Sequence, residues 1–182
     1  MTVEVVVFDI GNVLIGWNPE AHFDRRIGAD RRRALFAEVD LHHMNEQIDL
    51  GAPFRDSIYA LAEQHPEWRD DIRDWHDSWI EMITPVIDHS VTLLRRLRAK
   101  GVPVYALSNF GVESYAFAQT RFDFLNEFDR EYISGRMQVM KPDPRIYAAV
   151  EADVACGPGA LLFADDRADN IAAAAARGWQ TH

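Results

Sequence analysis

Carboxylate side chains follow two short apolar runs in the sequence. Asp9 ends the run Val3–Phe8, and the adjacent pair Asp165 and Asp166 ends the run Ala160–Ala164. Adjacent carboxylates repel each other unless a cation or a shared proton intervenes. Mg²⁺ in proteins binds one or two carboxylates and completes its coordination with water, so Asp9 and one of this pair could supply its ligands. Taken singly, Asp9 could instead cap a turn or a helix, and the pair could form a solvated turn.

Two other segments carry groups that could bind an anion. Ser108 and Asn109 follow a third apolar run, Val102–Leu107. A hydroxyl, an amide and backbone N–H groups at that point can donate hydrogen bonds to phosphate-like oxygens. Lys141 is one of two lysines in the chain, and the prolines around it stiffen the backbone that presents its ammonium group. Ser-Asn is also a common turn dipeptide, and lysine usually lies on the surface.

A parallel sheet is the element that would bring these groups together. The three apolar runs are typical of strands buried on both faces. Helices are predicted over Ser90–Lys100, Pro144–Val150 and Asp169–Arg177, and a further short strand could begin within Trp179–His182. Strands that alternate with helices form a parallel sheet covered on both sides, and ligands bind at the carboxyl ends of its strands. The sequence therefore predicts an α/β fold with a Rossmann-like, three-layer core.

Residues 16–87 have a different pattern, with no convincing strand and many charged and aromatic residues at helical spacing. Proline and glycine divide them into three or four predicted helices. We expect a helical cap, inserted after the first strand and placed over the ligand-binding end of the sheet, with a core formed by residues 1–15 and 88–182. Four tryptophans could line a sugar pocket or simply form the interior of the cap: Trp17, Trp68, Trp75 and Trp79. Arg25, Arg26 and Arg31–Arg33 could form a solvated face or contact a substrate anion.

Composition limits the classes of partner. The 182 residues suffice for one core with a small lobe, and 19 Lys and Arg against 29 Asp and Glu give a net charge of −10. This charge disfavours nucleic acid and anionic membranes, so an anionic ligand needs a local metal ion or lysine. Cys156 is the single cysteine, and the N-terminal residues lack the pattern of a signal peptide. We expect a cytoplasmic protein, monomeric or homodimeric.

Four segments in this order resemble the motifs of the haloacid dehalogenase-like (HAD) hydrolase superfamily. They are FDIGNVL at 8–14, LSNF at 107–110, MKPDPRIY at 140–147 and LFADDRADNI at 162–171. The resemblance covers essentially the whole chain. Within the superfamily, the motifs are most similar to the sugar-phosphatase branch that includes bacterial α-glucose-1-phosphatase.

The resemblance implies a Mg²⁺-dependent phosphatase of a small phosphorylated metabolite, with a sugar phosphate as one candidate. Asp9 would be the nucleophile that forms an aspartyl-phosphate, and Ser108 and Lys141 would act with it in catalysis. Ser108, Asn109 and Lys141 would bind the substrate. The metal site would comprise Asp9, the backbone carbonyl of Gly11, Asp165 and Asp166. Asn170 would lie next to these ligands without binding the metal itself. A carboxylate that attacks a phosphate needs such positive charge to offset their repulsion.

Gly11 departs from the pattern of this superfamily. Most of its phosphatases carry a second aspartate at this position, which protonates the leaving group and later activates water. Loss of a general acid typically slows a reaction about 10²- to 10⁴-fold when the leaving group is poor. Either the substrate has a good leaving group, or a cap residue or a bound water replaces the acid. His42 and His43 are candidates, although both could be ordinary exposed helix residues.

Two other functions stay open. A 2-haloacid dehalogenase also forms an ester on an aspartate but needs no metal, and the two extra negative charges of Asp165 and Asp166 would hamper such a nucleophile. A catalytically weak protein of the same fold that binds a partner or a metabolite is the other alternative, because a fold alone does not establish a function.

Overall fold

The computed structural model describes residues 2–182, and its centre is a parallel sheet with the strand order β3-β2-β1-β4-β5. The strands are β1 (Val5–Phe8), β2 (Val104–Ser108), β3 (Arg130–Ile133), β4 (Leu161–Ala164) and β5 (Gln180–Thr181). Every residue of β1 and β2 is buried, as their apolar runs indicate. The predicted α/β fold is confirmed, including the short strand at the end of the chain.

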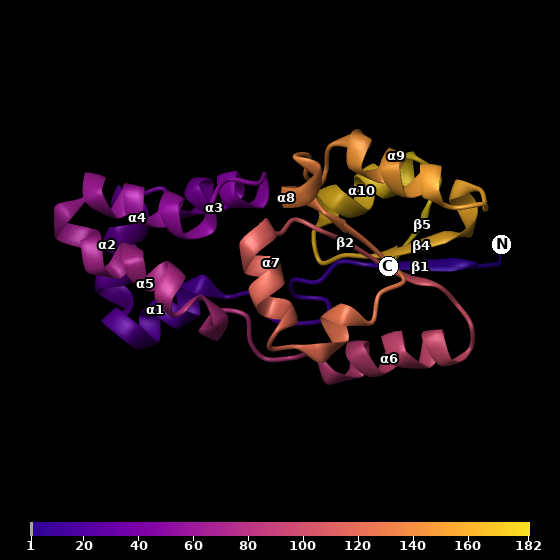
Figure 1. Cartoon of the computed structure of the whole chain (residues 1–182), viewed down its shortest axis with the longest axis horizontal. Helices are drawn as coiled ribbons and strands as arrows, with labels where there is room; N and C mark the ends of the chain where they lie inside the picture. The colour runs from indigo at the N-terminus through magenta and orange to yellow at the C-terminus, as the bar shows by residue number, and fades with distance from the viewer. Residues whose placement is uncertain (1) are drawn as a thin grey trace.

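Helices cover both faces of the sheet (Figure 1). Val6 and Phe8 pack into a cluster with α6 (Asp88–Ala99) and α7 (Val112–Gln119). Val5 and Val7 face the opposite side and pack with α9 (Pro144–Asp153) and α10 (Ala168–Ala176). Because side chains alternate along a strand, a continuous apolar run supplies both clusters.

Three core elements were not predicted: β3, α7 and the short α8 (Ser134–Met137). Strand β3 lies at the edge of the sheet, and its first residue, Arg130, is exposed. An edge strand with charged residues lacks the apolar run that marks a central strand, so its pairing with β2 becomes visible only in three dimensions.

The chain between β1 and α6 forms helices at one end of the molecule (Figure 1). They are α1 (Pro19–Ile27), α2 (Ala29–Glu38), α3 (Leu41–Asp49), α4 (Phe54–Gln64) and α5 (Arg69–Asp77), with short 3-10 turns at Pro66–Trp68 and Trp79–Glu81. Two of the breaks contain no proline: Gly28 ends α1 with φ +82°, and the Asp40 side chain caps α3. The structure therefore has more helices here than the proline pattern predicted, and the cap boundary at residues 16 and 87 stays a prediction. Among residues 2–182, no helix has the length and apolar character needed to span a membrane.

The two segments that connect these helices to the sheet run side by side. The Gly16 N–H donates to the carbonyl of Pro85 at 2.8 Å, and the Ile87 N–H donates to that of Leu14 at 2.9 Å. A Cβ atom on Gly16 would lie 2.5 Å from the carbonyl oxygen of Thr84. This close backbone approach requires glycine and helps fix how the helices meet the sheet.

We expect Gly16→Ala to lower the free energy of unfolding by about 1–3 kcal/mol, because the added methyl group collides with backbone that cannot rotate away. Gly157→Ala is the matched control, since a Cβ on Gly157 meets no atom within 4 Å. Urea unfolding of both variants checks this expectation. Equal stability of the two variants would show that the connection tolerates a wider separation.

Candidate active site

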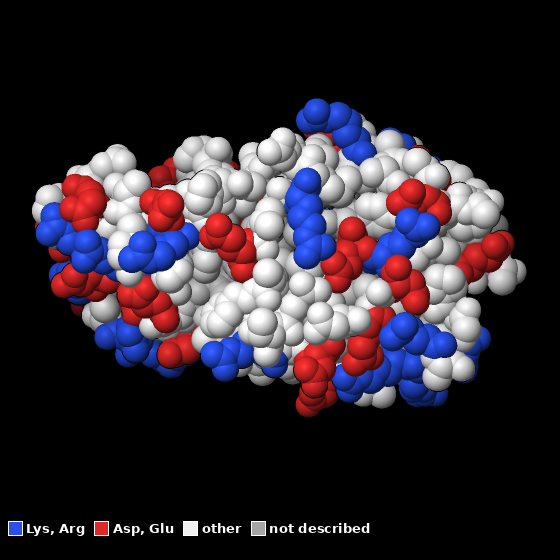
Figure 2. All heavy atoms as spheres, in the orientation of Figure 1, with Lys and Arg blue, Asp and Glu red and all other residues white. Residues whose placement is uncertain are grey.

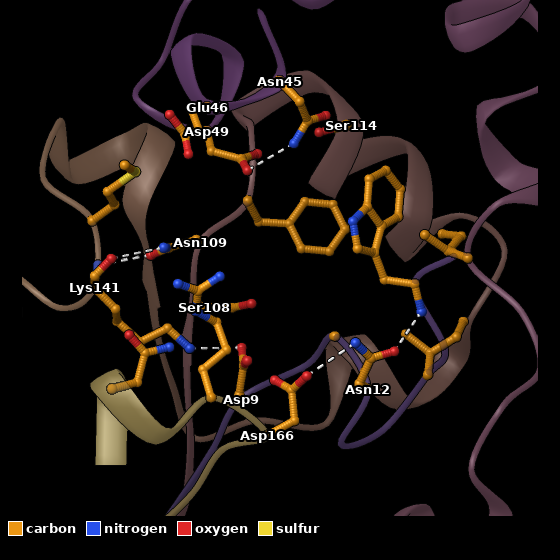
Figure 3. Close-up of a pocket in the computed structure, with 18 of the residues that line it drawn as sticks. Asp9, Asn12, Asn45, Glu46, Asp49, Ser108, Asn109, Ser114, Lys141 and Asp166 are labelled. Carbon is orange, nitrogen blue, oxygen red and sulfur yellow. Dashed lines mark hydrogen bonds and ion pairs between the residues drawn. The ribbon is translucent and has the colours of Figure 1, made fainter. Parts of the chain in front are cut away.

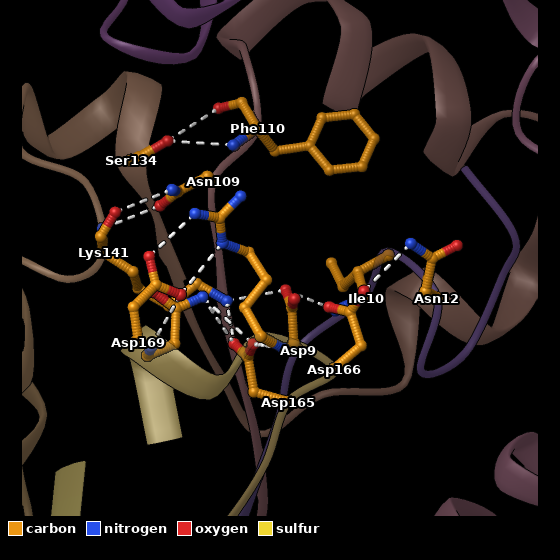
Figure 4. A network of polar contacts seen from close by, with 12 residues as sticks. Asp9, Ile10, Asn12, Asn109, Phe110, Ser134, Lys141, Asp165, Asp166 and Asp169 are labelled. Atoms are coloured by element: carbon orange, nitrogen blue, oxygen red, sulfur yellow. Dashed lines mark hydrogen bonds and ion pairs between the residues drawn. The ribbon is translucent and has the colours of Figure 1, made fainter. Parts of the chain in front are cut away.

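The loops at the carboxyl ends of β1, β2 and β4 converge on one cluster of polar side chains (Figure 4). Asp9 follows β1, Ser108 is the last residue of β2, and Asp165 and Asp166 follow β4. One carboxylate oxygen from each of the three aspartates lies within 4.8 Å of the others. The structure thus brings together the acids that the sequence placed more than 150 residues apart.

Lys141 links two of these acids. Its Nζ lies 2.9 Å from Oδ1 of Asp9 and 2.6 Å from Oδ2 of Asp165, and its side chain is only 1% exposed. The segment before α9 is held in place by Asn109, whose Oδ1 accepts from the Lys141 N–H at 2.8 Å and whose Nδ2 donates to the Lys141 carbonyl at 3.0 Å. The side-chain amide of Asn109, expected to bind substrate, is therefore engaged in positioning the lysine.

The adjacent aspartates have different surroundings. Asp165 is buried and also accepts from the Nδ2 of Asn170 at 3.0 and 3.1 Å and from the backbone N–H of Arg167 at 2.8 Å. Asp166 is exposed and accepts from the Nδ2 of Asn12 at 3.0 Å. Asp165 thus anchors the lysine, while Asp166 stays accessible from the cavity.

Asp9 is buried, and its Oδ1 accepts from the backbone N–H of Ile10 at 2.7 Å. Burial raises the pKa of its carboxyl group, and the nearby charge of Asp165 raises it further. The ammonium group of Lys141 and a hydrogen bond from Ser108 act in the opposite direction and lower this pKa. Lys141 is therefore the group of this chain that most favours the charged, nucleophilic form of Asp9.

The donor set fits a hard divalent cation. Asp9 and Asp166 offer carboxylate oxygens, and Gly11 lines the same cavity with its backbone. Asn170 lines the same cavity, and its Oδ1 is buried and has no hydrogen-bond donor among the described residues. Buried acceptors are normally satisfied, so this oxygen indicates a donor at the site that the described residues do not supply. Oxygen ligands of this kind are those that Mg²⁺ prefers.

A cavity of about 460 Å³ opens above the aspartates (Figure 3). Its aromatic wall contains Trp17, Trp79 and Phe110. Trp68 and Trp75 do not line it and are buried among the helices. Of the four tryptophans, therefore, only Trp17 and Trp79 reach the cavity. This mixture of aromatic wall and converging polar groups is typical of a small-molecule site.

The histidines and arginines singled out from the sequence lie mostly at the surface. His42 lines the cavity with a 57% exposed side chain, whereas His43 does not line it. Figure 2 shows basic and acidic side chains interspersed over the helices rather than gathered in a basic patch. Four of the five arginines pair with acids of the helices, and the fifth, Arg25, is exposed: Arg26 pairs with Asp74, Arg31 with Asp71, Arg32 with Asp24 and Arg33 with Asp30. These ion pairs support the interpretation as a solvated helix face.

Among the cavity residues that the sequence did not predict, Asp49 is a half-buried acid. It is the last residue of α3, and its Oδ2 accepts from the Nδ2 of Asn45 at 3.0 Å. Burial is the main cause that raises the pKa of Asp49 to about 7; a hydrogen bond from the Gly111 backbone opposes it, and the charges of Glu46 and Asp9 add to it. No motif marks this position, because only the packing of α3 against the core brings it to the cavity.

Comparison with known proteins shows similarity over almost the whole chain. Residues 3–178 match the sequence profile of a family described as haloacid dehalogenase-like hydrolase. A sesquiterpene phosphatase of Aspergillus oryzae is 23% identical over 194 residues, which cover 97% of this chain and 87% of that protein. A drimenol cyclase of Aspergillus calidoustus is 23% identical over 98% of this chain, and this chain spans only 33% of that longer protein.

Solved structures share the fold. A HAD family enzyme of Bacteroides thetaiotaomicron gives a TM-score of 0.79 at 22% identity, covering 100% of this chain and 93% of that chain. A structure of that enzyme with magnesium and inorganic phosphate gives 0.75 at 23% identity, with 99% and 93% covered. The L-2-haloacid dehalogenase of Xanthobacter autotrophicus, with chloropropionic acid covalently bound, gives 0.69 at 19% identity, with 99% and 76% covered. At these identities the similarity shows the fold alone.

We expect Lys141→Met to lower the free energy of unfolding by about 3–5 kcal/mol in EDTA, because it leaves two buried carboxylates without their cation. Lys100→Met replaces the other lysine, which is exposed, and should leave stability unchanged within about 0.5 kcal/mol. Urea unfolding at neutral pH compares the two variants. A similar small effect for both would contradict a structural role for the buried ammonium group.

Proposed function

Because the chain belongs to the haloacid dehalogenase-like hydrolase family, we propose that it is a Mg²⁺-dependent phosphatase of a small phosphorylated metabolite that forms an aspartyl-phosphate on Asp9. The observation that carries this proposal is the buried ion cluster at the floor of the cavity. There Lys141 joins Asp9 to Asp165, while Asp166 faces the cavity. A carboxylate nucleophile, a fixed cation and a free carboxylate at one point are the groups that phosphoryl transfer requires.

The cluster gives each residue a separate task. Asp9 attacks the phosphorus, and Lys141 offsets the negative charge of Asp9 and of the phosphoryl oxygens. Ser108 donates a hydrogen bond to one of these oxygens. Asn109 acts through Lys141, because both of its amide contacts fix the backbone of that residue. The contribution of such groups is placement and electrostatic stabilisation of the transferring phosphoryl group.

Asp9, Asp166 and the carbonyl of Gly11 would hold Mg²⁺. When bound, the ion supplies positive charge to the phosphoryl oxygens. Asp165 would contribute to this site through its charge, since Lys141, Asn170 and the Arg167 backbone already occupy its oxygens. This assignment also explains how a chain with a net charge of −10 accepts an anionic substrate.

The cavity limits the leaving group. A volume of about 460 Å³ is within the range of sites for small molecules. The aromatic wall suits an apolar face, such as that of a sugar ring or a hydrocarbon, and the side of the cavity across from Asp9 and Asp166 carries Asn45, Glu46 and Asp49. The negative charge of Glu46 there disfavours a second phosphate on the substrate. The similarity to a sesquiterpene phosphatase supports a phosphate ester over a haloacid.

We expect phosphate release from a panel of phosphomonoesters to require Mg²⁺, to stop in EDTA and to fall about 10³-fold or more in Asp9→Asn, which lacks the nucleophile. Asp56→Asn, an exposed acid on α4, is the matched control and should keep full activity. Halide release from 2-chloropropionate is measured beside it. Halide release without phosphate release would identify a dehalogenase, and the absence of both reactions would favour a binding protein.

A further inference from the structure

The proposed reaction lacks a proton donor for the leaving group, because Gly11 has no side chain. Several ionisable groups share the cavity: His42, Glu46 and Asp49 on α3, Asp9 after β1, Lys141 before α9, and Asp166 and Arg167 after β4. Lys141 is held by Asp9 and Asp165, and Arg167 pairs with Asp169 at 2.7 Å. Asp9 and Asp166 belong to the proposed metal site. The remaining groups all come from α3.

Two of the three groups on α3 are turned towards solvent. The side chain of His42 is 57% exposed, and its Nε2 lies 3.2 Å from Oε1 of Glu20. The side chain of Glu46 is also 57% exposed, and its Oε2 lies 3.8 Å from Nδ1 of His43. His42 and Glu46 are therefore engaged with surface partners, Glu20 and His43, and are not fixed at the cavity wall. Asp49 alone among the three is half-buried at the cavity wall, above Asp9 in Figure 3.

We propose that Asp49 is the general acid and base of this site and replaces the acidic residue absent at Gly11. This assignment rests on the proposed phosphatase function. It places the proton donor on the helical insertion and the nucleophile on the sheet, so the leaving-group oxygen would lie between the two.

Asp49 is held firmly to the core. Its backbone carbonyl accepts from the hydroxyl of Ser134 at 2.5 Å, and Ser134 also accepts from the Phe110 N–H at 2.9 Å. Its carboxyl group accepts from Asn45 and from the Gly111 backbone. Phe110 and Gly111 belong to the loop that follows Ser108, so the proposed acid and the phosphoryl-binding residues are fixed by one segment. A proton donor needs such support because its carboxyl group must stay within hydrogen-bond distance of the leaving-group oxygen.

The electrostatic surroundings of Asp49 support the same role. No cation is among the groups that act on its carboxyl group, while burial, Glu46 and Asp9 together raise its pKa to about 7. A carboxyl group with this pKa is half protonated at neutral pH, which is the best compromise for a group that donates and then accepts a proton. A half-buried carboxyl group without a cation beside it is also costly to stability, and such groups cluster at functional sites.

The proton balance closes over the two steps. In the first, Asp9 forms a bond to phosphorus, the bond to the leaving oxygen breaks, and protonated Asp49 gives its proton to that oxygen, releasing the alcohol. In the second, the Asp49 carboxylate takes a proton from water as the water oxygen attacks phosphorus. The bond between Asp9 and phosphorus then breaks, releasing hydrogen phosphate, and Asp49 is protonated again.

The test compares leaving groups in Asp49→Asn, which keeps the size of the side chain and an oxygen that can accept from Gly111. For an alkyl phosphate, whose alkoxide leaves poorly, kcat/KM should fall about 10²- to 10⁴-fold. For 4-nitrophenyl phosphate, whose leaving group needs no proton, we expect a loss of less than about 5-fold. Asp56→Asn, which removes an exposed acid of α4 outside the cavity, should leave this ratio unchanged. Equal losses for both esters, or no loss for either, would overturn the assignment.

A pH profile separates proton donation from simple positioning. With the alkyl phosphate, kcat/KM of the unaltered protein should decline above a pH of about 7, as Asp49 loses its proton, and this limb should be absent in Asp49→Asn. Persistence of the limb in that variant would overturn the assignment while leaving the proposed function intact. If the unaltered protein releases phosphate from neither ester, the proposed function itself fails, and the role of Asp49 fails with it.

Discussion

The site depends on an ammonium group buried between two carboxylates. Lys141, Asp9 and Asp165 are almost fully buried, and burial of any one charge alone would cost several kcal/mol. Each is tolerable only because the others are present and because Asn109, Asn170 and backbone N–H groups satisfy the remaining donors and acceptors. This requirement constrains the sheet: Asp9 after β1 and Asp165 after β4 must both reach one ammonium group, while Asn109 after β2 holds the backbone of Lys141.

The division of labour between the two adjacent aspartates follows from this cluster. One of them completes the ion cluster, and the other is left free at the cavity for a cation. The two acids across the cavity also differ in their surroundings: burial raises the pKa of both Asp9 and Asp49, but only Asp9 has a cation, Lys141, beside it that favours its charged form. Two carboxylates with different surroundings can serve as nucleophile and proton donor at one pH. The proposed proton donor thus lies on α3, whereas the loop after β1, which carries Asp9, has only Gly11 at the position where an acid is expected.

Much of the floor of the site could be predicted from sequence because strand ends are local features. Asp9, Ser108 and the Asp165–Asp166 pair each follow an apolar run, and parallel strands deliver their carboxyl ends to one edge. Asp49 could not be found in this way, since its position depends on how α3 packs against Ser134 and the loop after β2. Strand β3 was not predicted for a related reason, because an edge strand with exposed residues carries no apolar run. The partner of Asn109 was also invisible, because a turn dipeptide does not reveal which backbone its amide will bind.

The central claim is that a covalent phosphoryl group forms on Asp9, and trapping that intermediate tests it most directly. The protein is quenched during turnover of a phosphomonoester with Mg²⁺, reduced with borohydride, digested and mapped by mass spectrometry. Reduction of an aspartyl-phosphate converts the aspartate to homoserine, so the account predicts this change at position 9 and its absence when EDTA is present. Sustained phosphate release with an unmodified Asp9 would contradict the account, because it would mean that water attacks the substrate directly.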